Sequence, residues 1–319
     1  MSTSSNRNPM NKPTDMSEPV ASGDINIHGC TISWENASMR DVRLWRVAAE
    51  KGDFMAQHNL GYSYVVGLGV VQDYVEAAQW FQLAVNQGCA AAQHHLAQLY
   101  CMGCGIPQDD KEAARLFHLS AIQGHSDAQR FLGEFYLYGK GVPQNLEEGV
   151  RWLLMAANQE SDLAQLMLGH CFKMGIGVKA DALEAARWFR RSEANGNVEA
   201  IVGVGVSYLN GSGYPRNVYQ AMWKFVEAAR NGVASSHYYH GLCHSGVADI
   251  PEDLIQAFQY FETGASHGDR NAMKKLALCY RDGLGVRKNA KKAEHWSSRA
   301  ETQAATTVEA SLSRLQSIF

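Results

Sequence analysis

The sequence predicts an all-α fold, a right-handed α-solenoid of about seven 36-residue helix-turn-helix repeats with a helical cap at each end. Three series of residues with a common 36-residue step lead to this prediction. The first is a set of single glycines, with Glu160 at the one missing step: Gly52, Gly88, Gly124, Gly196, Gly232 and Gly268. The second is a set of Gly-x-Gly pairs, which begin at Gly67, Gly103, Gly139, Gly175, Gly211 and Gly283. The third is a set of large apolar residues: Trp80, Leu116, Trp152, Trp188, Tyr260 and Trp296.

The elements follow in order along the chain. Residues 1–24 are rich in Ser, Asn and Pro and are predicted to be disordered. Apolar residues alternate on either side of His28-Gly29, so residues 25–38 are expected to be extended or to form a hairpin. Residues 39–302 form the predicted solenoid, which begins with a lone helix that has Leu44 in the large apolar position. Residues 303–319 have apolar residues at helical spacing and are predicted to form the C-terminal capping helix.

Each repeat is predicted to hold two helices, called A and B. In the A helix of the first repeat, Ala56, Leu60 and Tyr64 are four residues apart and share one face. The glycine after each B helix suits a left-handed helix end, and the Gly-x-Gly after each A helix permits a tight reversal. Small residues such as Gly61 in the A helices are expected to let helix backbones approach closely. Because one helix pair cannot bury its apolar stripe alone, stacking of pairs supplies the core.

This pattern resembles a known repeat family. The run Ala-Gln-x-x-Leu-Gly-x-x-Tyr at Ala56–Tyr64, the Gly-x-Gly-Val loop and Ala77-Ala78-x-Trp80 look like the Sel1-like repeat, a relative of the tetratricopeptide repeat. The resemblance covers more than four-fifths of the chain. It implies a protein that binds another protein without catalysis, with the A helices on the inner surface of a curved array.

Composition narrows the range of partners. A net charge of −3 and a pI near 6.5 give no Lys and Arg excess that would predict a nucleic-acid or membrane partner. The amino terminus has no apolar stretch after a basic start, and no run of about eighteen apolar residues occurs. The sequence therefore predicts a cytoplasmic protein, and no cofactor is expected.

Two motifs have both a chemical and a structural interpretation. The Gly-x-Gly-Val loops could be phosphate cradles, but their repetition at a fixed step favours turn geometry. Cys101 and Cys104 form a Cys-x-x-Cys with no second pair, which favours free thiols over a zinc or redox site. The odd number of cysteines, seven, also argues against a disulfide framework.

The sixth repeat departs most from the pattern. His237, His240 and His244 fall in its A helix beside Cys243, and the loop that follows has Val247 and Asp249 in place of the glycine pair. His240 and His244 are four residues apart, a spacing that can bind one metal ion. No acidic residue completes a metalloprotease motif, so packing is the favoured interpretation. A metal-dependent protein or a hydrolase that uses this cluster is the alternative of a different class.

Variable A-helix positions are the candidate partner surface. Three rows of large residues follow from the repeat: Met102, Tyr138 and Met174; Phe131, Met167 and Tyr239; Leu99 and Phe135. For the last row a core role is favoured. The others predict a concave groove for an extended or helical segment of another protein, because Met and aromatic side chains give large, adaptable contacts. The predicted function is a non-catalytic scaffold or adaptor. A toxin-neutralising, effector-neutralising or regulatory binding protein is the alternative within the same class.

Overall fold

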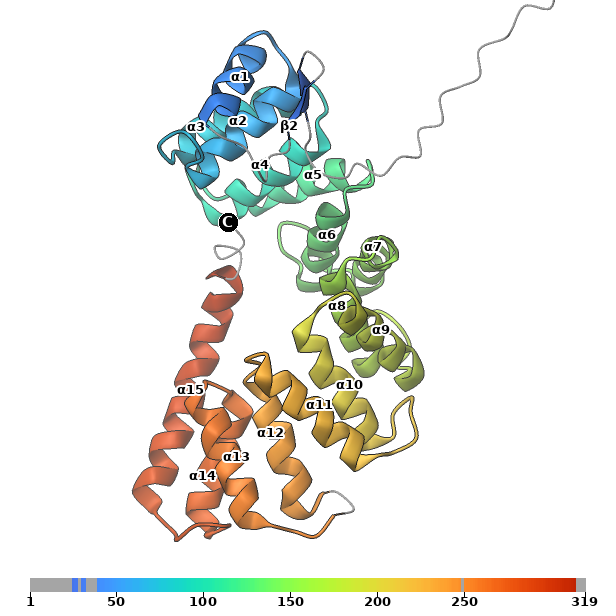
Figure 1. The fold of residues 1–319 in the computed structure, drawn as a ribbon, viewed down its shortest axis with the longest axis vertical. Helices are drawn as coiled ribbons and strands as arrows, with labels where there is room; N and C mark the ends of the chain where they lie inside the picture. Colours follow the sequence, from blue (N-terminus) through green and yellow to red (C-terminus); the bar gives the residue numbers. More distant parts are fainter. Residues whose placement is uncertain (1–24, 28–29, 33–38, 248–249, 314–319) are drawn as a thin grey trace, which may run out of the picture.

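The all-α solenoid is confirmed. The computed structural model describes residues 25–27, 30–32, 39–247 and 250–313, and its helices stack into an open arch (Figure 1). The array begins with α1 (Met39–Glu50). The A helices are α2 (Phe54–Val66), α4 (Ala90–Met102), α6 (Ser126–Tyr138), α8 (Asp162–Met174), α10 (Val198–Asn210), α12 (Ser235–Leu242) and α14 (Arg270–Asp282). The B helices are α3 (Tyr74–Asn86), α5 (Asp110–Ala121), α7 (Leu146–Asn158), α9 (Ala182–Ala194), α11 (Val218–Arg230), α13 (Leu254–Ser266) and α15 (Ala290–Ser313).

Local sequence sets where these helices begin and end. B helices begin after an Asp or Asn whose side chain accepts hydrogen bonds from the first free backbone N–H groups, as Asp73 does from Val75 and Glu76. In the regular repeats, each A helix ends at a glycine in the left-handed conformation. For example, α6 ends at Gly139, whose φ is 67°. Glu160 stands where the other repeats have a glycine, and it adopts the same kind of positive φ, 66°.

The ends of the chain differ from a simple repeat. Two short strands, β1 (Ile25–Ile27) and β2 (Cys30–Ile32), pair antiparallel with Ile25 opposite Ile32. At the other end, α15 is one continuous helix of 24 residues, so the structure does not separate a capping helix at residue 303 from the last B helix. The predicted disordered segment 1–24 and residues 314–319 lie outside the described residues.

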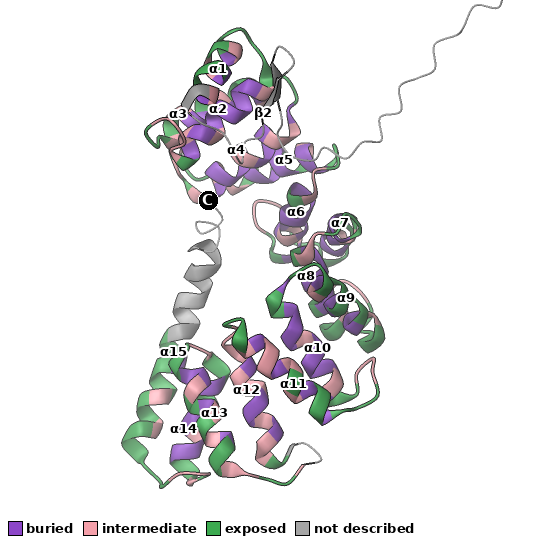
Figure 2. Cartoon of the chain, in the orientation of Figure 1, coloured by how far each residue is buried: buried purple, intermediate pink, exposed green. Residues whose placement is uncertain are grey.

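The most deeply buried side chains of the B helices lie one residue after the Trp80 series that the sequence predicted as the large apolar position. Residues after the Trp80 position are almost fully buried: Trp45, Phe81, Phe117, Leu153, Phe189, Phe225 and Phe261. The Trp80 row itself is mixed, since Leu116 is buried while Trp80, Tyr260 and Trp296 are only partly so. In α1 the expected Leu44 is exposed and Trp45 enters the core instead. Buried positions follow the helix sides that meet neighbouring helices (Figure 2).

The small A-helix residues make room for these rings. A Cβ at Gly61 would lie 2.7 Å from the Phe81 ring, and one at Gly169 would lie 2.5 Å from the Phe189 ring. Real Cβ atoms do not approach carbon so closely. The glycine therefore accommodates the B-helix ring of its own repeat, which is more specific than the close backbone approach expected from sequence.

A ladder of buried amides joins the first four repeats. Gln129 donates to the carbonyl of Ala121, and its own side-chain oxygen accepts from Gln159 at 2.7 Å. The amide–amide hydrogen bond recurs between Gln57 and Gln87, Gln93 and Gln123, and Gln165 and Asn195. Buried amides with satisfied partners fix orientation, because any shift leaves them unpaired. The ladder ends at the fifth repeat, where the equivalent residue is Ile201.

Gln129→Leu is expected to lower the free energy of unfolding by about 1–3 kcal/mol, since it leaves buried amide and carbonyl groups unpaired. Urea denaturation followed by circular dichroism measures the change. Exposed Gln82, which bonds only to Asn86 in its own helix, gives the control Gln82→Leu, expected within about 0.5 kcal/mol of the parent. Equal effects of the two substitutions would contradict a stabilising role for the ladder.

Candidate functional site

The candidate site lies at the carboxyl ends of the A helices. Tyr138 and Met174 are the last residues of α6 and α8 and have exposed fractions of 73% and 68%. Met102 ends α4 in the same way but is half-buried against the core. Val66, the equivalent residue of the first repeat, was not singled out from sequence and is 41% exposed. We call Val66, Met102, Tyr138 and Met174 the A-helix row.

The second predicted row is buried to different degrees, and its prediction as a partner surface is wrong for Phe131. Phe131 is only 2% exposed and stacks on the Phe117 ring at 5.0 Å, so it cannot contact a partner while the repeat is folded. Met167 is half-buried and packs against a core cluster. Tyr239 is half-buried and stacks on Phe225 at 5.6 Å. These side chains face the neighbouring B helix, which sequence spacing alone does not reveal.

Ion pairs flank Tyr138. Arg130 pairs with Glu134 on the same helix, and the Lys140 ammonium lies 3.2 Å from the Asp110 carboxylate of the preceding repeat. Burial raises the pKa of Glu134, although Arg130 opposes the shift. Partial desolvation at the helix end, with a smaller contribution from Glu134, also raises the pKa of Tyr138, although most of its side chain is exposed, so the hydroxyl stays protonated. The surroundings of Tyr138 are thus suited to apolar and hydrogen-bonding contacts.

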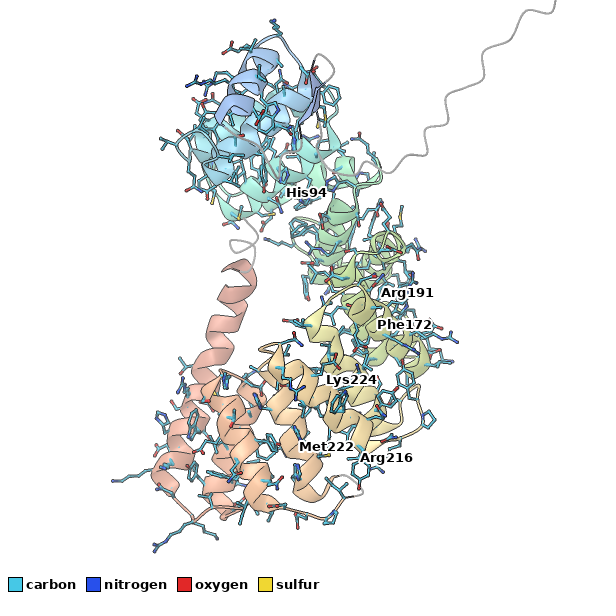
Figure 3. The ribbon with its side chains drawn as sticks, in the orientation of Figure 1. His94, Phe172, Arg191, Arg216, Met222 and Lys224 are labelled. Atoms are coloured by element: carbon cyan, nitrogen blue, oxygen red, sulfur yellow. The ribbon has the colours of Figure 1, made fainter. Side chains whose placement is uncertain are left out.

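A chain of histidine rings crosses the first three repeats. His58 stacks on His95 at 5.2 Å, His95 contacts His94 at 5.1 Å, and His94 stacks on His125 at 4.7 Å (His94 is labelled in Figure 3). Burial lowers the pKa of His58 to about 4 and that of His95 to about 3. The pKa of His94 is also lowered by burial, with His125, His95 and Arg130 adding repulsion. These rings are neutral at pH 7.

The histidines of the sixth repeat form stacks. The rings of His240 and His244 lie nearly parallel to Tyr260, at 4.0 and 5.6 Å, and His237 stacks on His267 at 5.4 Å. Within the described ranges, no three His, Cys, Asp or Glu side chains converge on a position that could hold a metal ion. In the loop after this helix, Gly246 adopts φ 75° and so provides a turn glycine one position before Val247. Residues 248–249 lie outside the described residues.

The two thiols of the Cys-x-x-Cys differ in environment, since Cys101 lies in α4 and Cys104 follows it. Cys101 is buried, and burial raises the pKa of its thiol to about 12, which disfavours the thiolate at neutral pH. Cys104 is half-buried in the loop beyond it.

One exposed aromatic pair was missed by the sequence reasoning. Tyr219 and Trp223 lie one turn apart on α11, and Trp223 is 62% exposed. Lys224, labelled in Figure 3, takes the large apolar position of this repeat. It pairs with Glu193 at 2.6 Å and with Glu227 at 2.9 Å. The signal was present in the sequence, since Trp223 is offset by one residue from the Trp80 series.

Comparison with known proteins agrees with the repeat architecture. A Sel1 repeat protein from Oxalobacter formigenes is 28% identical over 76% of this chain and 96% of its own, with a TM-score of 0.70. The protective antigen c5321 of uropathogenic Escherichia coli, which displays an SLR fold, is 28% identical over 88% of this chain and 59% of its own, with a TM-score of 0.67. Curated proteins gave no significant match.

Of the helices in the described residues, none is long and apolar enough to cross a bilayer. The Sel1 repeat model matches seven consecutive segments: residues 54–89, 90–125, 126–161, 162–197, 198–233, 228–269 and 270–304. With repeats that cover most of its length, the chain belongs to the Sel1 repeat family.

Proposed function

We propose that this protein is a non-catalytic scaffold or adaptor that holds a partner polypeptide along the A-helix row. The observation that supports this proposal most strongly is the exposure of Tyr138 and Met174 at equivalent positions of neighbouring repeats. Large apolar side chains are costly to expose to water, and a set of them on a folded surface is typical of an interaction site.

Sel1 repeat proteins are generally scaffolds for protein–protein interaction and typically have no catalytic activity. The chemistry of the A-helix row fits a binding role. Met174 is flexible and polarisable, and Tyr138 combines an apolar ring with a hydroxyl that can donate a hydrogen bond. The ion pairs Arg130–Glu134 and Lys140–Asp110 hold polar groups beside Tyr138, as in an apolar contact with a polar rim.

The variant Tyr138→Asp/Met174→Asp is expected to lose the partner while its helicity stays unchanged, because both side chains are exposed in the free protein. Loss of one hot-spot contact of about 2 kcal/mol weakens binding roughly 30-fold. The measurement is affinity capture from the native cell with parent and variant, followed by titration of the captured polypeptide against both.

Leu83→Asp/Leu183→Asp is the matched control, since it also removes two exposed large side chains, on the B helices α3 and α9. Its expected capture equals that of the parent. Normal capture by the Tyr138→Asp/Met174→Asp variant would contradict the proposal. An adaptor and a protein that neutralises a toxin or effector would use the same surface, and the identity of the captured polypeptide distinguishes them.

A further inference from the structure

The last repeat concentrates positive charge. Residues 270–300 contain nine Lys and Arg against two acids, a net charge of +7, although the whole chain has −3. The other residues, with twenty basic and thirty acidic side chains, therefore have −10. If the flanking acids Asp269 and Glu301 are counted as well, basic side chains still outnumber acidic ones by five in residues 269–301. We call the nine residues the basic patch: Arg270, Lys274, Lys275, Arg281, Arg287, Lys288, Lys291, Lys292 and Arg299.

Little of this charge is neutralised within the repeat. All nine side chains are exposed except that of Lys275, which is half-buried. Among the described residues, the ion pair recorded for the basic patch joins Arg281 to Asp282 at 2.8 Å. In earlier repeats the B-helix arginines pair with a glutamate one turn before, as Arg151 does with Glu148. Neighbouring cations within a Debye length of about 8 Å repel one another, so the patch keeps a strong positive potential.

The basic patch lies on a surface that earlier repeats cover. Lys274 corresponds to His94 of the second repeat, which is buried against His125 and Phe131 of the third. In the seventh repeat Lys274 is exposed, and α15 is the last helix of the described residues. A depression of ≈ 390 Å³ between α14 and α15 is lined by Lys274, Ala277, Leu278, Arg281, Ala293, Glu294 and Ser297.

The sign of the charge is opposite to that of the other repeats. Where α7 begins with Glu147 and Glu148, α15 has Lys291 and Lys292. Cations near the amino end of a helix are unfavourable, because that end already has a partial positive charge. A terminal repeat needs a polar outer face for solubility, but mixed charges would meet that need. An excess of positive charge that is unfavourable at the start of α15 therefore points to an anionic ligand.

We propose that the basic patch docks an acidic polypeptide segment. The 13 residues of α14 span about 20 Å, which an extended segment of about six residues matches. Leu278 in the depression provides an apolar contact beside the cations. This second site is separate from the A-helix row and does not depend on it.

Charge disfavours two other occupants. A nucleic acid has one negative charge per about 1.7 Å and would continue past the patch along repeats with a net charge of −10. End-to-end stacking of a second copy would bring the basic patch against α1, whose net charge is +1, from three arginines, Asp41 and Glu50. A short acidic segment would not extend onto the negatively charged repeats, and it would not be repelled by the positive charge of the basic patch.

The test uses the full chain and a fluorescein-labelled peptide of about six Asp and Glu residues with interspersed Leu, with its Asn and Gln analogue as the reference ligand. In Lys291→Glu/Lys292→Glu, acids replace the two lysines as at Glu147 and Glu148, so α15 is expected to stay folded. Fluorescence anisotropy is expected to show binding that weakens with salt and falls about tenfold or more in this variant. The control Lys111→Glu/Lys179→Glu makes the same change of total charge at exposed lysines elsewhere and is expected to bind as the parent does.

Several results would overturn the proposal: no binding of the acidic peptide at about 50 mM salt, equal binding of its Asn and Gln analogue, or equal binding by the Lys291→Glu/Lys292→Glu variant. Tighter binding of single-stranded DNA or of anionic phospholipid vesicles would assign the patch to those ligands instead. Light scattering that shows self-association of the parent, lost in the variant, would assign it to a second copy. Tyr138→Asp/Met174→Asp is expected to retain peptide binding, so failure at one site leaves the other testable.

Discussion

Between pH 7.5 and pH 5 the protein is expected to lose several kcal/mol of its free energy of unfolding. The cause is the chain of histidine rings from His58 to His125, which are buried or half-buried. The pKa of His58 falls to about 4 and that of His95 to about 3 in the folded protein, against 6.5 for the unfolded chain. Each unit of difference corresponds to about 1.4 kcal/mol, and over this pH interval each of the two residues contributes roughly 2 kcal/mol.

The sign follows from proton binding. Between pH 6.5 and about 4 the unfolded chain binds protons at these histidines and the folded protein does not. Acidification therefore favours unfolding. The loss begins as the pH falls through 6.5 and is complete below the folded pKa values. Most carboxylates titrate below pH 5, so their contribution is largely separate from this window.

Urea denaturation at pH 7.5 and pH 5 measures the effect. His58→Gln/His95→Gln is expected to reduce the difference between the two pH values, whatever its effect on stability at pH 7.5. His118→Gln, at an exposed position on α5, is the control and is expected to keep the difference of the parent. A stability independent of pH over this interval would contradict the neutral buried state of the histidines.

Gly141→Ala is expected to be among the most damaging single-methyl substitutions in the array. A Cβ at Gly141 would lie 1.9 Å from the carbonyl oxygen of Asp110, which belongs to the first turn of the preceding B helix. Gly141 also has φ 66°, where an alanine costs about 1–2 kcal/mol. Relief of the clash requires the two repeats to move apart, at a further cost of about 1–3 kcal/mol. Thermal and urea melts followed by circular dichroism measure the sum.

Gly124→Ala is the matched control. Gly124 has φ 92°, and a Cβ there would meet no atom within 4 Å, so only the backbone cost of about 1–2 kcal/mol applies. The expected order is therefore a small loss for Gly124→Ala and a clearly larger one for Gly141→Ala. Equal losses would show that turn conformation alone explains the second glycine of each pair.

The two glycines of each Gly-x-Gly pair thus have different roles. Gly139 ends α6 in the left-handed conformation, and a Cβ there would lie 3.2 Å from the Gln144 Cβ, a tight contact with a side chain of the same loop. Gly141 lies against the backbone of the repeat before it. The sequence predicted the turn at both positions, because a turn is a local property. It could not predict the contact with the preceding repeat, because that depends on how two repeats stack.

The same division applies to the candidate site. The repeat register correctly aligned Met102, Phe131, Tyr138 and Met174 along the A helices. It did not separate Phe131, which stacks on Phe117, from Tyr138, which is exposed. Both are aromatic residues on the same helix, and their difference lies in which neighbouring helix covers each.

The sequence by itself determined the number of repeats, the period and the ends of most helices, since glycine conformation, helix caps and apolar spacing act within a few residues of the chain. Only the tertiary structure decided that Trp45 and Phe81 form the deep core, that His240 and His244 stack on Tyr260, and that most cations of the last repeat are exposed. These features depend on contacts between helices that are about 30 residues apart in sequence, and the spacing of residues along one helix carries no information about the rotation of the next.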